Sequence, residues 1–228
     1  MTTPVLHRAP RHPHVWAWCL LLSQAVVIAL WWRYGWQVGL PAMLASHLPF
    51  LWGTLVPDSA LFGPVLARLP VADKRAWLTI DDGPSDDTGA ILDLLDAHAA
   101  KATFFVVGER AQAALQDASG LRPRWFRAVV GMSNPFVAAV LRDEGLARVA
   151  WSARGFDGVR SDPRRVVARI EQQLRPGAIV LLHEGARHGR NVETLALLLQ
   201  RLDALGYRSV LPEQLEAPAG ISEAAGAP

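Results

Sequence analysis

The chain has 228 residues, of which 51% are hydrophobic, and its formal net charge is only +2. This length suffices for one well-buried domain with an additional segment. No cluster of basic residues alternates with aromatic ones, so the composition argues against nucleic acid as a partner. The single cysteine, Cys19, excludes an internal disulfide.

Residues 1–57 form an apolar segment that contains no Asp or Glu. Residues 15–32 are uncharged, which is about the minimum length for crossing a bilayer, and tryptophans stand at both ends of this run. No small-residue cleavage site follows, so the pattern favours a membrane span over a signal peptide. A second uncharged stretch, 38–56, is interrupted by Pro41 and Pro49 and is either a second span or an interfacial segment.

Basic residues flank this apolar segment. Arg8 and Arg11 precede the first span, and Arg68, Lys74 and Arg75 follow the second stretch. Under the positive-inside rule, two spans put both ends of the chain in the cytoplasm, whereas a single span puts the following domain outside. We therefore expect a membrane protein, with a slight preference for a helical hairpin, and leave the side of its soluble domain open.

The remainder of the chain is interpreted as a linker over 58–75, one domain over 76–215 and a disordered tail over 216–228. Within the domain, short apolar runs alternate with helical periodicity, which predicts an α/β fold with parallel strands. The expected strands cover 77–81, 102–107, 125–130, 148–152, 178–183 and 207–211. The expected helices begin near Ser85–Asp87, Asn134–Pro135, Asp162–Pro163 and Asn191.

Polar residues stand where several of these strands end, which in parallel α/β folds is the edge that carries the site. They are Asp81 and Asp82 with the following Gly83 and Pro84, then Arg127, Trp151, Asp157 and His183. Each residue type also has a structural role, since Asp-Asp-Gly-Pro is an ordinary turn sequence. Their convergence on one rim favours a functional site.

Four motifs, in this order, resemble those of the polysaccharide deacetylases, the NodB-homology group also called carbohydrate esterase family four. They are Leu78–Pro84 (LTIDDGP), Ala102–Gly108 (ATFFVVG), Phe126–Gly131 (FRAVVG, with Val129 in place of a proline) and Leu181–Glu184 (LLHE). The resemblance spans residues 76–215.

This resemblance implies an incomplete (β/α) barrel of about six parallel strands. It also implies hydrolysis of the amide C–N bond of an N-acetylated glycan or glycolipid at the bacterial inner membrane, with a divalent metal, usually zinc. By motif position Asp81 is the general base, Asp82 a metal ligand and His183 the general acid, and Arg127 orients the base. The implied substrate pocket includes Gly83, Pro84, Trp151 and Asp157.

One motif of the family has no counterpart in this chain. Its His-[Ser/Thr]-x-x-His pair supplies two metal ligands, yet no histidine occurs between His98 and His183. The link 109–124, with an expected helix at 111–118, is long enough for one parallel crossover. Because catalytic zinc usually takes three protein ligands, we expect weak zinc binding, with His188 as the candidate substitute ligand.

Three hypotheses follow from this departure. The chain is an amidohydrolase of N-acetylated sugars at a membrane, an inactive relative that binds glycan or protein, or the product of an internal deletion in an active parent.

Overall fold

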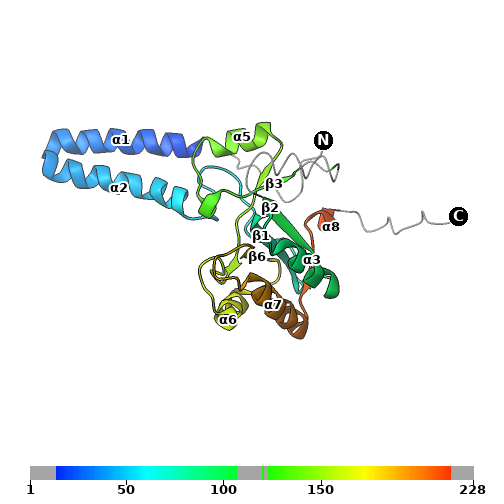
Figure 1. The fold of residues 1–228 in the computed structure, drawn as a ribbon. Coiled ribbons are helices and arrows are strands. Elements are labelled where there is room, and N and C mark those ends of the chain that lie inside the picture. The colour runs from blue at the N-terminus through cyan, green and yellow to red at the C-terminus, as the bar shows by residue number, and fades with distance from the viewer. Residues whose placement is uncertain (1–13, 107–119, 121–122, 217–228) are drawn as a thin grey trace. The chain divides into compact units, whose positions relative to one another are not determined.

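The computed structural model describes residues 14–106, 120 and 123–216. The described residues fall into two compact units, which we treat separately. The first unit holds residues 67–106, 120, 123 and 151–216, and the second holds residues 14–66 and 124–150. Figure 1 shows the elements in chain order.

The first unit is built on a five-stranded sheet with the order β2-β1-β6-β5, in which β7 also pairs with β1. All of its strand pairs are parallel, as the alternation of strands with helices predicts. The strands are β1 (Arg75–Gly83), β2 (Ala102–Val106), β5 (Ala153–Arg154), β6 (Ala178–His183) and β7 (Arg208–Ser209).

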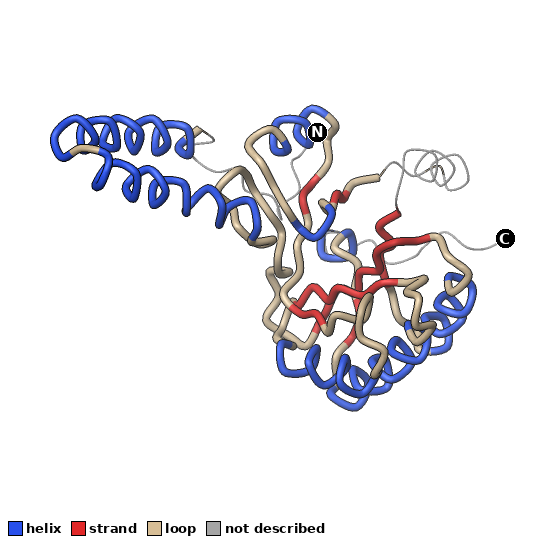
Figure 2. Tube along the Cα trace, turned by 60° about the vertical axis from the view of Figure 1, so that its left-hand side comes forward, coloured by secondary structure: helices blue, strands red, loops and turns tan. Residues whose placement is uncertain are grey.

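Three helices pack together along one side of this sheet, as Figures 1 and 2 show. They are α3 (Thr88–Ala97), α6 (Pro163–Gln173) and α7 (Asn191–Leu205), and the short α8 (Glu213–Glu216) follows. Alternate residues of β1, namely Ala76, Leu78 and Ile80, enter the core that these helices close. The opposite face of β1 carries Trp77, which is also fully buried and donates from Nε1 to Thr103 Oγ1 over 2.8 Å.

Local sequence accounts for the start of α6 and for the end of α7. Asp162 caps α6 because its Oδ1 accepts from the backbone N–H groups of Arg164 (3.1 Å) and Arg165 (3.3 Å). Helix α7 ends at Gly206, whose φ of 72° lies in the left-handed region. Helix α7 begins at Asn191, as the sequence predicts, but the Asn191 side chain does not cap it: its Oδ1 accepts from the Ala186 N–H instead.

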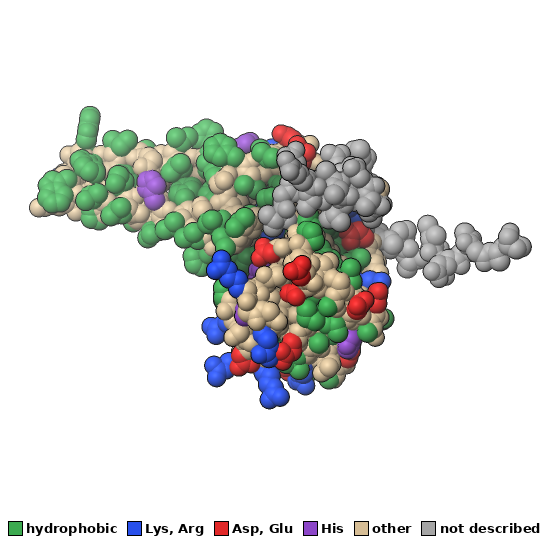
Figure 3. All heavy atoms as spheres, in the orientation of Figure 1, with side chains coloured by type: hydrophobic (Ala, Val, Ile, Leu, Met, Phe, Trp, Pro, Cys, Tyr) green, Lys and Arg blue, Asp and Glu red, His purple; other side chains and the backbone are tan. Residues whose placement is uncertain are grey.

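The second unit contains two antiparallel apolar helices, α1 (Val15–Tyr34) and α2 (Trp36–Leu55), joined at Gly35. The expected hairpin is therefore confirmed, and Pro41 and Pro49 lie inside α2 without ending it. Both helices are long and apolar enough to cross a membrane, and only 6% and 11% of their most apolar stretches are buried. A core helix would be mostly buried, so this role does not fit them. Figure 3 shows hydrophobic side chains over both helices.

The remainder of the second unit consists of β3 (Trp125–Phe126), η1 (Val129–Gly131), α5 (Val137–Asp143) and β4 (Ala147–Arg148). Strands β3 and β4 pair in parallel as a separate two-stranded sheet. Within the segment interpreted above as a linker, Leu66 forms a parallel bridge to Val149, and the Ser59 carbonyl accepts from the buried Arg148 guanidinium.

The parallel α/β architecture is confirmed, whereas three strand ranges are corrected. The strand expected over 207–211 is shorter, since β7 covers only Arg208–Ser209. The strand expected over 125–130 ends at Phe126, because the chain turns through η1 with Val130 at a φ of 49°. Of the strand expected over 148–152, only Arg148 is in a strand, as the last residue of β4, and β5 begins after this range. The helix expected at 111–118 lies outside the described residues. Closure of the strands into an incomplete barrel of about six strands stays a prediction, as do the domain limits.

Candidate active site

The ends of β1 and β6 bring Asp81 and His183 together at the carboxyl edge of the five-stranded sheet. These two residues are direct register partners in the parallel pair. The N–H of Glu184 then donates to the Asp81 carbonyl over 3.1 Å, which continues the pairing beyond the strand. Because neighbouring residues of two parallel strands share a face, the two candidate acid–base groups lie on the same face of the sheet.

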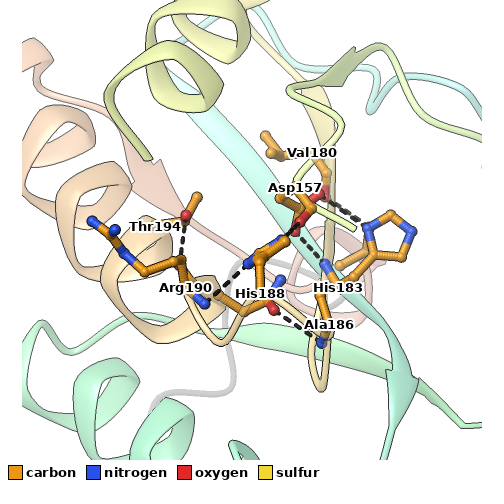
Figure 4. Close-up of polar contacts among 9 residues, drawn as sticks. Asp157, Val180, His183, Ala186, His188, Arg190 and Thr194 are labelled. Carbon is orange, nitrogen blue, oxygen red and sulfur yellow. Dashed lines mark hydrogen bonds and ion pairs between the residues drawn. The ribbon is translucent and has the colours of Figure 1, made fainter. Parts of the chain in front are cut away.

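Asp157 holds His183 from the loop that follows β5. Its Oδ1 lies 3.0 Å from His183 Nδ1, and its Oδ2 accepts from the His183 backbone N–H over 2.6 Å. The Asp157 side chain is only 2% exposed, whereas that of His183 is 24% exposed. A carboxylate bound to Nδ1–H fixes the ring orientation and leaves Nε2 as the nitrogen that can exchange a proton. Figure 4 shows this arrangement.

The charge on His183 depends on these carboxylates. Burial lowers the pKa of His183, but the hydrogen bond to Asp157 and the negative charges of Asp157, Asp81 and Asp82 outweigh it. The net result is a pKa above the ordinary histidine value. The imidazole therefore carries its proton at higher pH than a free histidine does, as a general acid requires.

Glu184 ties the loop after β1 to the end of β6. This carboxylate is 2% exposed, and its Oε2 accepts from the hydroxyls of Ser85 (2.8 Å) and Thr88. Its Oε1 lies so close to Gly83 that a Cβ added there would meet it at 2.0 Å. Gly83 is therefore needed for close approach of the carboxylate rather than for a special φ. Pro84, the other expected pocket residue of this loop, is exposed and follows Gly83 through a cis peptide bond.

Asp82 and His188 are the expected metal ligands. Asp82 is exposed at a φ of 70°, at the irregular end of β1. The Nε2 of His188 lies 2.6 Å from the Asp157 carbonyl, and its Nδ1 lies 3.1 Å from the Arg190 N–H, so backbone groups engage both ring nitrogens. Across residues 14–106, 120 and 123–216, no three His, Cys, Asp or Glu side chains gather as metal ligands would. The donor set in this part of the chain does not fit catalytic zinc.

The other two expected residues lie on either side of the division between the units. Arg127 belongs to the second unit, where its guanidinium donates to the Ala150 carbonyl over 3.2 Å. Its expected ion pair with Asp81 or Asp82 stays a prediction. Trp151 belongs to the first unit, and the Arg154 guanidinium lies 5.3 Å from its ring centroid.

Two contacts of the site were missed from the sequence. Asp157 was expected in the substrate pocket, and the structure makes it the buried partner of His183. Gly158 lies against the His183 ring, since a Cβ added there would come within 3.4 Å of the imidazole. The available signal was a carboxylate between Gly155 and Gly158, which indicates a tightly packed loop.

Comparison with known proteins agrees with the four motifs. The pattern of the family described as polysaccharide deacetylase matches residues 68–114. A chitooligosaccharide deacetylase of Bradyrhizobium is 31% identical over 190 residues, which cover 59% of this chain and 87% of that protein. A peptidoglycan-N-acetylglucosamine deacetylase of Bacillus cereus is 26% identical over 198 residues, covering 67% of this chain and 93% of the relative.

Solved structures show the same fold at lower identity. The peptidoglycan deacetylase PdaC of Bacillus subtilis gives a TM-score of 0.56 at 23% identity, covering 63% of this chain and 90% of PdaC. A pseudoenzyme of carbohydrate esterase family four from Bacillus anthracis gives 0.57 at 21% identity, covering 64% of this chain and 66% of its own. With the sequence match over most of the Bradyrhizobium enzyme, these findings establish that the chain belongs to the polysaccharide deacetylase family.

Proposed function

We propose that the chain is a membrane-anchored member of this family that binds N-acetylated sugars at the carboxyl edge of its sheet and hydrolyses their amide bond only slowly. The observation that carries this proposal is the pairing of the buried Asp157 carboxylate with His183, beside Asp81. A buried carboxylate that orients an imidazole is typical of a group that transfers protons.

The proposed chemistry divides proton transfer between two residues. Asp81 accepts a proton from the attacking water, and His183 donates one from Nε2 to the departing amine. Asp157 keeps the proton of Nδ1 in place and stabilises the imidazolium. By its motif position, Arg127 is the residue that we expect to orient the general base. Such acid–base help accounts for only about 10²–10⁴-fold of rate.

The slow rate follows from the incomplete metal site. The family is typically metal-dependent, and a bound metal polarises the amide carbonyl and lowers the pKa of the attacking water. Asp82 has no histidine pair beside it in the sequence, because none occurs between His98 and His183. The Bradyrhizobium alignment supports a deletion, since its 190 positions take in only 59% of the 228 residues here and therefore include gaps in this chain.

The same absence of histidines favours a second candidate, a relative that binds glycan without turnover. The proton-transfer residues alone do not separate the two candidates, because both keep the same binding edge. Measured turnover of a bound N-acetylated oligosaccharide separates them.

Membrane anchoring is the second part of the proposal. Helices α1 and α2 present apolar side chains over their outer surface, and Trp18, Trp32, Trp36 and Trp52 are exposed near their ends. Tryptophan favours the boundary between lipid and water. We place this hairpin in the bacterial inner membrane, where it anchors the rest of the chain.

The test uses the full-length chain in detergent micelles. Calorimetric titration with a chitin oligosaccharide should give measurable binding, and the fully de-N-acetylated oligomer should bind more weakly. His183→Ala should weaken binding of the acetylated oligomer, whereas His98→Ala, which removes an imidazole paired with Asp203 at 2.7 Å, should not. Equal affinity for the acetylated and deacetylated oligomers would contradict the proposal.

A further inference from the structure

The second unit exposes a group of large apolar side chains outside its two long helices. They lie on η1, on the loop after it and on α5, and we call them the α5 patch: Val129 (83% exposed), Val130 (67%), Met132 (41%), Phe136 (77%) and Val140 (57%). Single exposed apolar residues are ordinary on a protein surface. Five exposed large apolar side chains within twelve positions of the chain are more than a water-facing segment usually carries.

The α5 patch is attached to the carboxyl end of α2. The buried Ser133, within the patch sequence, donates its N–H to the Thr54 carbonyl over 3.1 Å. The loop after α2 also packs on α5, since a Cβ added at Gly63 would come within 2.5 Å of the Ala138 Cβ. All four residues belong to the second unit, so these contacts hold the patch beside the last turn of the apolar helix.

The polarity of α5 changes along its length. Phe136 precedes the helix, Val140 lies one turn further, and the exposed, charged Arg142, Asp143 and Glu144 stand at its far end. In Figures 1 and 2, α5 lies on the side of the helix pair that is away from the Gly35 turn. The apolar residues therefore lie at the amino end of α5 and the charged residues at its carboxyl end.

Tryptophans mark the same end of the hairpin. Trp18, in the first turn of α1, and Trp52, in the last turn of α2, are each 65% exposed. Because the two helices are antiparallel, both rings lie at the end where Ser133 meets Thr54. Exposed tryptophans at this level are typical of the boundary between lipid headgroups and acyl chains.

We propose that the α5 patch is a second membrane contact, which enters the headgroup–acyl boundary beside the hairpin while the charged end of α5 stays in water. This inference rests on the membrane anchoring proposed above. Lipid fits the patch because the patch carries no charge and is continuous with helices whose own apolar surface needs lipid. Contact of the α5 patch with lipid would fix the depth of the loop after Arg127 at the bilayer surface.

Site-directed fluorescence in vesicles tests the inference on the full-length chain. In a Cys19→Ser background, single cysteines at Met132, Val140, Glu144 and Leu22 carry an environment-sensitive dye. The vesicles contain phosphatidylcholine and phosphatidylglycerol, with lipids that bear a nitroxide at a shallow or a deep acyl carbon. Labels at Met132 and Val140 should lose most of their fluorescence to the shallow nitroxide, and the label at Glu144 should not.

The remaining variants separate the two proposals. Phe136→Asp, added to the Met132 label, should restore its fluorescence, while the Leu22 label in the middle of α1 stays quenched by the deep nitroxide. If the Met132 and Val140 labels match the Glu144 label while Leu22 is quenched, the patch does not contact lipid although the anchor does. If the Leu22 label is also unquenched, the anchoring proposal and this inference both fail.

Discussion

The two units of the chain place their largest apolar side chains in opposite ways. The first unit buries Trp77, Leu78 and Ile80 almost completely inside a sheet covered by helices. The second unit leaves Trp18 and Phe136 at 65% and 77% exposed. The first unit therefore gains its stability by burying apolar side chains away from water. The second unit exposes large apolar side chains, as the proposed membrane anchoring requires.

Several buried polar groups of the first unit form hydrogen bonds within that unit. Asp157 is bound to His183, Thr79 Oγ1 donates to the Val180 carbonyl over 2.7 Å, and Glu184 accepts two hydroxyl groups. Each bond offsets the cost of removing the group from water. The acid–base pair thus lies in a unit that binds these groups with its own atoms, whereas Glu184 Oε1 and Asn191 Nδ2 are buried there with no hydrogen-bond partner among the described residues.

A pair of tryptophan substitutions tests this comparison with the largest expected effect. Trp77→Ala should lower the free energy of unfolding by about 3–5 kcal/mol, because it leaves a cavity in a fully buried position. Trp18→Ala should change it by less than about 0.5 kcal/mol, because the ring makes little contact with the folded chain. Denaturant unfolding of the full chain in micelles measures both, and equal losses would show that the units do not differ in this way.

Two glycines of the first unit provide the next test. Gly83→Ala should destabilise the fold by about 1–3 kcal/mol, because the added methyl overlaps the buried Glu184 carboxylate. Gly89→Ala, on α3 with nothing within 4 Å of the added Cβ, should instead stabilise it by about 0.5–1 kcal/mol. Thermal unfolding of both variants decides the sign, and a tolerated Gly83→Ala would show that the Glu184 loop shifts freely.

A smaller effect is expected at the start of α6. Asp162→Ala removes the side-chain cap of this helix and should cost about 1 kcal/mol. Asp93→Ala removes an exposed carboxylate from the middle of α3 and should leave the free energy of unfolding nearly unchanged. A similar response from both variants would argue against capping as the source of the difference.

The smallest expected effect is on the titration of His183. Its pKa is raised in the folded chain, so the protonated ring stabilises the fold below its unfolded value of 6.5, and this contribution is lost as the pH rises through the raised pKa. Asp157→Asn should lower the pKa of His183, whereas Asp203→Asn should not change it. Nuclear magnetic resonance titration of the ring measures both, and an unchanged titration in Asp157→Asn would refute the assigned pairing.

The sequence predicted the centre of the fold better than its edges. Strand β6 was expected over 178–183 and occurs there. The apolar run is short, contains the β-branched Ile179 and Val180 and follows Pro176-Gly177, which together favour a strand over a buried helix. The run 148–152 looked similar, but Val149 bridges Leu66 from the segment after the hairpin. Local periodicity carries no information about such a distant partner.

The candidate site was predictable in position and less so in its contacts. Asp81 and His183 were expected on one rim, and register pairs them there. The bond from Asp157 to His183 joins residues 26 positions apart, and a short motif does not encode it. His188 was a reasonable substitute ligand by residue type, yet its ring nitrogens engage the Asp157 and Arg190 backbones, which only the folded loop reveals.

The central claim is that this chain keeps the proton-transfer residues of its family without a complete metal site. Titration of the metal-free full chain with zinc, followed by deacetylation of a chitin oligosaccharide, tests it most directly. The account predicts weak zinc binding and turnover near background that Asp82→Asn hardly changes. Tight stoichiometric zinc, with turnover abolished by Asp82→Asn, would contradict it.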